Sequence, residues 1–139
     1  MLEGHCLCGK VRFEIRGRLG GVRYCHCSLC RHANGTAFSA NSSIRRENFT
    51  LISGEEDISE YESSPGARRC FCSNCGSPVF SRLESEPENI RLRLGTLAGE
   101  PDVKIESHVW VGSKSNWFEI TDDLPQHDEG AGPLDIGTG

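Results

Sequence analysis

The chain has 139 residues, which is enough for one domain with one hydrophobic core. Hydrophobic residues make up 36% and there are 16 glycines, so we expect a small core with many turns, and eight cysteines as the source of further stability. The formal net charge is −5 without a basic block, which argues against a nucleic-acid partner, and no apolar run is long enough to cross a bilayer.

Alternating apolar and polar side chains predict a half-buried strand over residues 10–17. Residues 20–27 predict a short strand that leads into a cysteine cluster. One helical turn is expected over residues 28–35, with Ser28 as its N-cap and Gly35 as its stop.

The rest of the chain continues the β pattern. Further strands are expected over residues 36–44, 48–54, 77–83, 89–97 and 104–113, and a hairpin over residues 59–72 turns at residues 64–66. The sequence therefore predicts a mainly β domain with little helix over residues 1–127. Residues 128–139 are rich in glycine and poor in apolar side chains, and they predict a flexible C-terminal tail.

The N-terminus lacks the charged flank and apolar stretch of a secretory signal, so a cytoplasmic location is expected. Thiols stay reduced in the cytosol, and cysteines there indicate metal binding or catalysis rather than disulfides. The alternative is a secreted disulfide scaffold whose signal has been removed.

The cysteines fall into three groups: Cys6 and Cys8; Cys25, Cys27 and Cys30; and Cys70, Cys72 and Cys75. The C-x-x-C-G spacing that begins at Cys72 is typical of a zinc knuckle. Structural zinc takes four tetrahedral ligands, so Cys6 and Cys8 with Cys72 and Cys75 predict one closed site. Such a site can supply about 10 kcal/mol or more, which is comparable to the whole stability of a small domain.

The group Cys25, Cys27 and Cys30 predicts a second zinc, for a total of two per chain. With three sulfurs this zinc keeps one open position, which marks a catalytic or exchangeable site. With Cys70 added, the site closes as a second four-thiolate centre. Cys70 and Cys72 point to the same face of a strand, so the sequence permits both arrangements.

Four segments, "GHCLCGKVRFEI", "YCHCSLCRHANGTAF", "SSPGARRCFCSNCGSPVF" and "SHVWVGSKSNWFEITDDLPQH", resemble the glutathione-dependent formaldehyde-activating enzymes, also called the GFA/CENP-V family. The resemblance implies a β-tent fold of antiparallel sheets stapled by zinc. Cys6, Cys8, Cys72 and Cys75 match the family's structural zinc ligands, and Cys25, Cys27 and Cys30 match its catalytic zinc ligands. Family members often carry another residue type at the position of Cys70.

The resemblance also implies an activity, which is the joining of glutathione and formaldehyde to give S-hydroxymethylglutathione. This is the chemistry of a carbon–sulfur lyase running in reverse. We therefore expect a zinc-dependent enzyme that acts on adducts of a glutathione-like thiol and an aldehyde. Four cations flank the motifs and are candidates to bind the carboxylates of the thiol: Arg31, Arg68, Arg69 and Lys114.

Two other functions are open at this stage. The first is a non-catalytic β-tent module in which both zincs are structural and a surface binds a protein partner. The second is a chromatin-associated role, which the charge of −5 disfavours. Long edge strands would also permit a homodimer.

Overall fold

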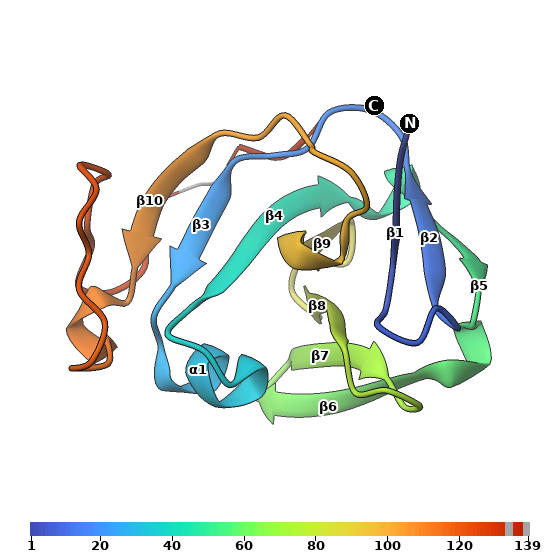
Figure 1. The fold of residues 1–139 in the computed structure, drawn as a ribbon, viewed down its shortest axis with the longest axis horizontal. Helices are drawn as coiled ribbons and strands as arrows, with labels where there is room; N and C mark the ends of the chain where they lie inside the picture. Colours follow the sequence, from blue (N-terminus) through green and yellow to red (C-terminus); the bar gives the residue numbers. More distant parts are fainter. Residues whose placement is uncertain (133–134, 138–139) are drawn as a thin grey trace.

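The computed structural model describes residues 1–132 and 135–137 and consists of two β-sheets and one short α-helix (Figure 1). The three-stranded sheet has the order β1 (Leu2–His5), β2 (Arg12–Ile15) and β5 (Phe49–Ser53). The seven-stranded sheet has the order β10 (Ile105–Val109), β3 (Val22–Cys25), β4 (Ser39–Arg45), β9 (Asn89–Arg93), β8 (Pro78–Leu83), β7 (Ala67–Cys72) and β6 (Ile58–Ser64). The prediction of a mainly β domain is confirmed.

Helical structure is short throughout the described residues. The helix α1 (Ser28–Asn34) ends at Gly35, which has a positive φ of 64°. Its N-cap is Cys27 and not Ser28, because the Cys27 sulfur accepts the hydrogen bond from the Cys30 amide. Four 3₁₀ turns follow strands or loops: η1 (Arg46–Asn48), η2 (Glu55–Asp57), η3 (Leu94–Thr96) and η4 (Val111–Ser113). Within residues 1–132 and 135–137, no helix has the length and apolar character that crossing a membrane requires.

One strand pairing departs from the antiparallel arrangement that we expected. The strand β10 pairs with β3 in parallel, so that His108 lies opposite Tyr24 and Val109 opposite Cys25. The other pairings between the named strands are antiparallel. The parallel pairing brings the end of β10 beside the first residue of the central cysteine group.

The hydrophobic core lies between the two sheets and is built by alternation along their strands. Phe13 and Ile15 of β2 pack with Ile44 of β4 and with Ile90 and Leu92 of β9. Because successive side chains of a strand point to opposite faces, the residues between these apolar positions face away from the core. The far face of the large sheet is therefore free to carry polar groups.

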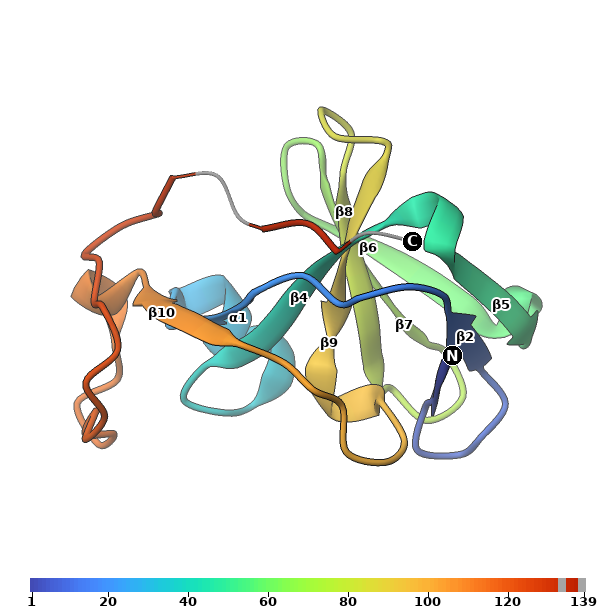
Figure 2. The same ribbon diagram turned by 90° about the horizontal axis from the view of Figure 1, so that it is seen from above.

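Residues 128–132 and 135–137 lie along the seven-stranded sheet (Figure 2). The amide of Trp110 donates to the Glu129 carbonyl and the amide of Gly21 donates to the Asp135 carbonyl. The Asp135 carboxylate also pairs with Arg18 at 2.7 Å. Residues 133–134 and 138–139 lie outside the described residues, and the flexibility of the tail stays a prediction.

Gly4 of β1 provides a test of the packing of this strand against β2 and against the 3₁₀ turn η3. A Cβ atom at Gly4 would lie 2.2 Å from Cζ of Phe13 and 2.8 Å from the Thr96 carbonyl oxygen. The Phe13 ring is 1% exposed and has no room to move. We therefore expect Gly4→Ala to lower the free energy of unfolding by about 1–3 kcal/mol in urea titrations of the metal-loaded protein.

Gly95→Ala is the matched control, because no atom lies within 4 Å of a Cβ placed there. This variant should keep the midpoint of the unfolding transition. Equal midpoints for the two variants would contradict the described contact between β1 and β2.

Candidate functional site

Cys6, Cys8, Cys72 and Cys75 form the first sulfur cluster, in which all four Sγ atoms lie within 4.8 Å of one another. The Sγ of Cys8 lies 3.5 Å from that of Cys6 and 3.8 Å from that of Cys72. Zinc–sulfur bonds of about 2.3 Å in a tetrahedron require sulfurs roughly 3.8 Å apart. The spacing and the chemistry of these four donors fit a zinc ion.

Two tight turns bring these sulfurs together. One follows β1 and the other follows β7, and each contains a glycine with φ of 80°, Gly9 and Gly76. Such a φ is costly for residues with a Cβ, so glycine is required at both turns. The turns also contact each other, since the Leu7 amide donates to the Ser77 hydroxyl at 2.9 Å. The same hydroxyl lies 3.3 Å from the Cys75 sulfur, and its hydrogen bond leads the contacts that lower the pKa of Cys75 to about 5.

Cys25, Cys27 and Cys30 form the second sulfur cluster, again with all Sγ atoms within 4.8 Å. Cys25 ends β3, Cys27 caps α1, and Cys30 lies buried in the first turn of that helix. Three sulfurs are one fewer than the four ligands of a closed zinc site. This donor set therefore fits a zinc ion that keeps one position for another ligand.

The pKa values of two thiols in the second cluster, Cys25 and Cys30, are shifted in opposite directions. The pKa of Cys30 is lowered, first by hydrogen bonds from the thiols of Cys25 and Cys27 and also by Ser39 and Arg69. The pKa of Cys25 is raised, first by its contact with the Cys27 thiol, then by that with Cys30 and by burial. The guanidinium of Arg69 lies 3.7 Å from the Cys30 sulfur, so a cation faces the site at which negative charge collects.

Cys70 does not join the second cluster. Cys70 follows Arg69 in β7, and adjacent residues of a strand point to opposite faces. Arg69 therefore points toward Cys30, while the Cys70 sulfur lies 3.7 Å from a carboxylate oxygen of Glu60 on the neighbouring strand. Burial is the main cause that raises the pKa of Cys70 to about 12, so its thiol stays protonated at neutral pH. Cys70 as a metal ligand stays a prediction that this geometry does not support.

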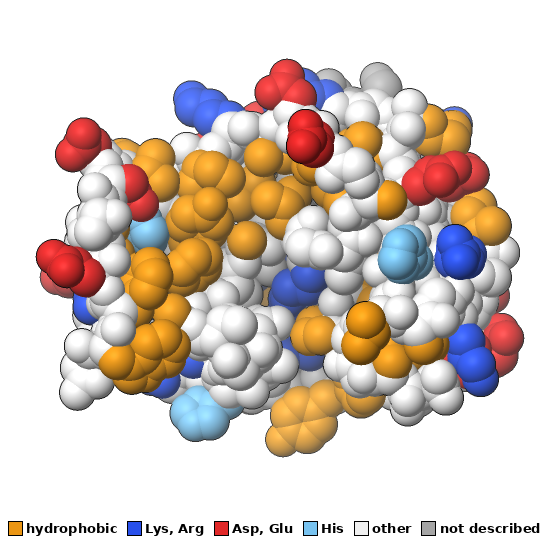
Figure 3. Space-filling model, viewed as in Figure 1, with side chains coloured by type: hydrophobic (Ala, Val, Ile, Leu, Met, Phe, Trp, Pro, Cys, Tyr) orange, Lys and Arg blue, Asp and Glu red, His pale blue; other side chains and the backbone are white. Residues whose placement is uncertain are grey.

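A cavity of about 630 Å³ lies against the second cluster. Its walls include the two sulfur residues Cys25 and Cys30 and four arginines: Arg23, Arg69, Arg91 and Arg93. Among the described residues, Arg91 alone of these four has a carboxylate within ion-pair distance, that of Glu86 at 3.7 Å. A smaller hollow of about 330 Å³ shares Arg93 with this cavity. Figure 3 shows a hollow in the middle of its face with basic side chains at the floor.

The sheet register explains how these arginines meet. Arg23 and Arg93 lie on either side of Asn41 in three adjacent strands, and Arg69 lies opposite Ser81 in β8. The Arg93 guanidinium donates to the side chains of Asn41 at 2.7 Å and Ser81 at 3.3 Å. Cys25 is two residues from Arg23 and so points to the same face.

Three buried guanidinium nitrogens of this cavity have no hydrogen-bond partner within the described part of the chain: Nε of Arg23, Nη1 of Arg69 and Nε of Arg93. Burial lowers the pKa of Arg93 to about 10, so the side chain remains charged at neutral pH. Unsatisfied buried donors are costly, and three positively charged ones that line one cavity fit an anionic ligand.

Of the four cations that the sequence suggested for substrate binding, the structure brings Arg69 to the cavity. Arg68 points to the other face and pairs with Glu84 at 3.2 Å. Lys114 donates to the carbonyls of Ser115 and Phe118, and Arg31 lies in α1 outside the cavity wall. Sequence reasoning missed Arg23, Arg91 and Arg93, whose alternation within β3 and β9 could have placed them on one face.

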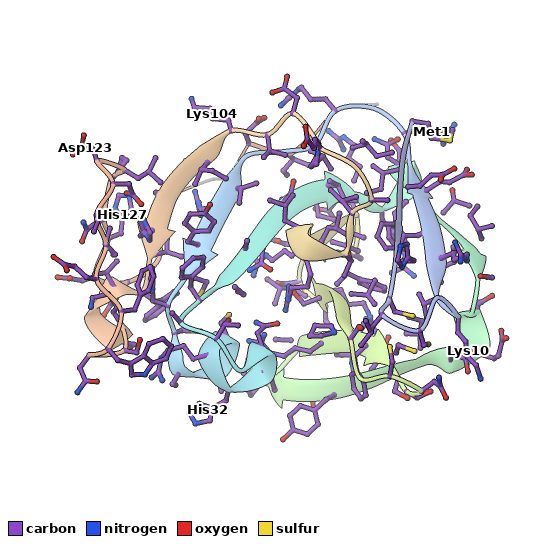
Figure 4. The ribbon with its side chains drawn as sticks, viewed as in Figure 1. Met1, Lys10, His32, Lys104, Asp123 and His127 are labelled. Carbon is purple, nitrogen blue, oxygen red and sulfur yellow. The ribbon has the colours of Figure 1, made fainter. Side chains whose placement is uncertain are left out.

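The histidines separate into buried and exposed ones. His32 points outward from α1, and its ring bonds to the Ser28 carbonyl at 2.7 Å (Figure 4). His26 and His108 are 0% and 1% exposed and contact each other through ring nitrogens 2.7 Å apart. Burial is the main cause that lowers the pKa of His26 to about 4.

Fold and site together define a class: a mainly β domain with two sulfur clusters, one of them open toward a basic cavity. Residues 1–113 match the model of the glutathione-dependent formaldehyde-activating enzyme family. The chain belongs to this family, as the sequence motifs predicted.

Individual relatives agree with this assignment. A Halomonas elongata protein that carries the provisional name glutathione-dependent formaldehyde-activating enzyme is 30% identical over 86% of this chain and 81% of its own. A Schizosaccharomyces pombe protein named as an uncharacterized lyase is 24% identical over 85% of this chain and 84% of its own. A crystal structure of a Rhodobacter sphaeroides protein superposes with a TM-score of 0.61 at 25% identity, covering 74% of this chain and 98% of that protein.

Substitutions of Cys30 and Cys70 should differ in their effect on the metal content of the protein. We expect Cys30→Ser to lower the zinc content by about one ion per chain, because the second cluster would keep two sulfurs. The matched substitution Cys70→Ser should leave the content of the purified protein unchanged, since the Cys70 sulfur lies outside both clusters. Elemental analysis of both variants measures this difference, and loss of zinc in Cys70→Ser would show that Cys70 is a ligand.

Proposed function

We propose that this protein is a zinc-dependent enzyme of the carbon–sulfur lyase type that joins a thiol to an aldehyde, with glutathione and formaldehyde as the substrates suggested by the names of its relatives. The observation that carries the proposal is the position of the second sulfur cluster in the wall of an arginine-lined cavity. The proposal places this chemistry in the cytoplasm with small-molecule partners, and it leaves the open edge of β6 for a homodimer.

The reaction needs a thiolate, because a free thiol with a pKa near 8.5 is only a few per cent ionised at neutral pH. Zinc held by Cys25, Cys27 and Cys30 would supply a site at which the incoming thiol is kept deprotonated. The thiolate sulfur forms a bond to the carbonyl carbon, the carbon–oxygen double bond becomes a single bond, and the resulting alkoxide takes up one proton. The thiol releases one proton when it ionises, which balances the proton that the alkoxide takes up, so no further reactant is needed.

The arginines give the chain its own contribution to this reaction. The three unpartnered guanidinium nitrogens can bind the carboxylates of the thiol and fix its orientation beside the cluster. Arg69 donates to the Cys30 sulfur, and its charge also faces the region in which the alkoxide would develop. Holding two reactants in the right geometry can lower a barrier by up to roughly 7–11 kcal/mol, which exceeds the roughly 2 kcal/mol available from ionising the thiol. Positioning is therefore the larger effect in this proposal.

The alternative is a non-catalytic module with two closed zinc sites and a protein partner. That function needs a fourth permanent ligand at the second cluster. The position of Cys70 on the opposite face of β7 supports the enzyme instead.

An NMR measurement of the exchange between the glutathione–formaldehyde adduct and its two free components, in the presence of metal-loaded protein, tests the proposal. The adduct of glutathione and formaldehyde also forms without a catalyst, so the rate of exchange is compared with and without protein. We expect faster exchange with the wild-type protein and the uncatalysed rate with Cys30→Ser. An uncatalysed rate with wild-type protein that holds both metals would contradict the proposal.

Substitutions of the neighbouring residues Arg69 and Arg68 test whether the cavity binds the thiol substrate. We expect Arg69→Ala to lower kcat/KM for the thiol by roughly 10–100-fold, the value of one or two hydrogen bonds to a charged group. Arg68→Ala should match the wild type, because its ion pairs lie on the opposite face. Steady-state rates at several thiol concentrations decide this, and equal effects of the two substitutions would refute the assigned cavity.

A further inference from the structure

A hydrogen-bonded chain of three side chains, two buried and one half exposed, lies behind the second sulfur cluster. The Asp122 carboxylate lies 2.9 Å from Nε2 of His108, and Nδ1 of His108 lies 2.7 Å from Nε2 of His26. Asp122 is 43% exposed at its outer end, whereas both histidines are fully buried. The chain therefore runs from solvent to the peptide that links Cys25 to Cys27.

The hydrogen bonds define which ring nitrogens carry protons in the neutral histidines. A carboxylate accepts, so His108 donates from Nε2 and its Nδ1 accepts. His26 then donates from Nε2, and its own Nδ1 is left as an acceptor, which has no partner among the described residues. Three aromatic rings, those of Tyr24, Phe38 and Phe118, pack against the pair. Two neutral polar rings in such surroundings are costly unless their mutual bond is kept.

Backbone hydrogen bonds also connect His26, the strand β10 that contains His108, and the segment that contains Asp122. The His26 amide donates to the Val109 carbonyl at 3.0 Å, so the residue between the two cysteines is tied to β10 by main chain and side chain. His108 in turn holds the following segment, because its amide donates to the Pro125 carbonyl and its carbonyl accepts from the His127 amide. Asp122 belongs to this segment and lies beyond residue 113, where the family match ends.

We propose that Asp122, His108 and His26 are positioning residues that hold the Cys25–Cys27 peptide in the geometry that binds metal. The inference rests on the proposed metal at the second cluster. His26 points away from the cavity while Cys25 points toward it, so fixing the imidazole from behind fixes the direction of the neighbouring sulfurs. Side chains that orient metal ligands from outside the coordination sphere typically change metal affinity by about 10–100-fold.

Competition with a chelator of known zinc affinity tests this role. The variants are Asp122→Ala, which removes the acceptor of the His108 ring at an exposed position, and His108→Phe, which keeps an aromatic ring. We expect both to weaken zinc binding at the second cluster by about 10–100-fold and to leave the first cluster unchanged. Asp123→Ala is the matched control, because Asp123 lies at the outer side of the same segment (Figure 4).

Nitrogen-15 spectra of the imidazole rings give a second readout, with protons expected on Nε2 of both His26 and His108. The inference is overturned if either variant keeps its second-site affinity within about twofold of the wild type, or if both clusters weaken equally together with the melting temperature. A proton on Nδ1 of His108 in the wild type would also overturn it. Failure of the proposed function is distinguishable, because the wild-type protein would then bind two zinc ions and leave the exchange of glutathione and formaldehyde at the uncatalysed rate. A wild-type protein that binds a single zinc would overturn both the function and this inference.

Discussion

The meeting of Cys6 and Cys8 with Cys72 and Cys75 is the contact on which the arrangement of the two sheets depends. It joins the turn after β1 to the turn after β7, and the Cys8 and Cys72 sulfurs are 64 positions apart in sequence. The core between the sheets is small, and its members come from short strands. A metal bound by four thiolates would add stability of the same order as that of a small domain. Because the metal site fixes the two sheets, the face of the large sheet that points away from the core can carry the arginines of the cavity.

Strand alternation connects this scaffold to the site. In β9, Ile90 and Leu92 pack in the core, while Arg91 and Arg93 line the cavity. In β7, Arg69 faces the second cluster and Cys70 faces away from it. One shift of register in either strand would bury the arginines and expose the apolar residues. The same register that forms the core therefore also sets the charge of the cavity.

Local patterns predicted much of this structure. The alternation in residues 10–17, the turn at residues 64–66 and the pairing of cysteine groups depend on neighbouring residues, and they were visible in the sequence. The arginine row depends on which strands are adjacent, and Arg23, Asn41 and Arg93 come from three separate segments. The bond between His26 and His108 depends on the parallel pairing of β3 with β10, which the expectation of antiparallel sheets did not contain. Alternation along the strand already indicated that Cys70 and Arg69 point to opposite faces. The sequence did not show which of the two faces the second sulfur cluster, because that depends on how the strands are arranged.

The central claim is that two sulfur clusters bind separate zinc ions and that the second ion has one exchangeable position. X-ray absorption at the zinc edge measures the average number of sulfur ligands directly. The account predicts about 3.5 sulfurs per zinc in the protein alone, from four at one site and three at the other, and about 4 after glutathione is added. A value of 4 sulfurs before any thiol is added would contradict it.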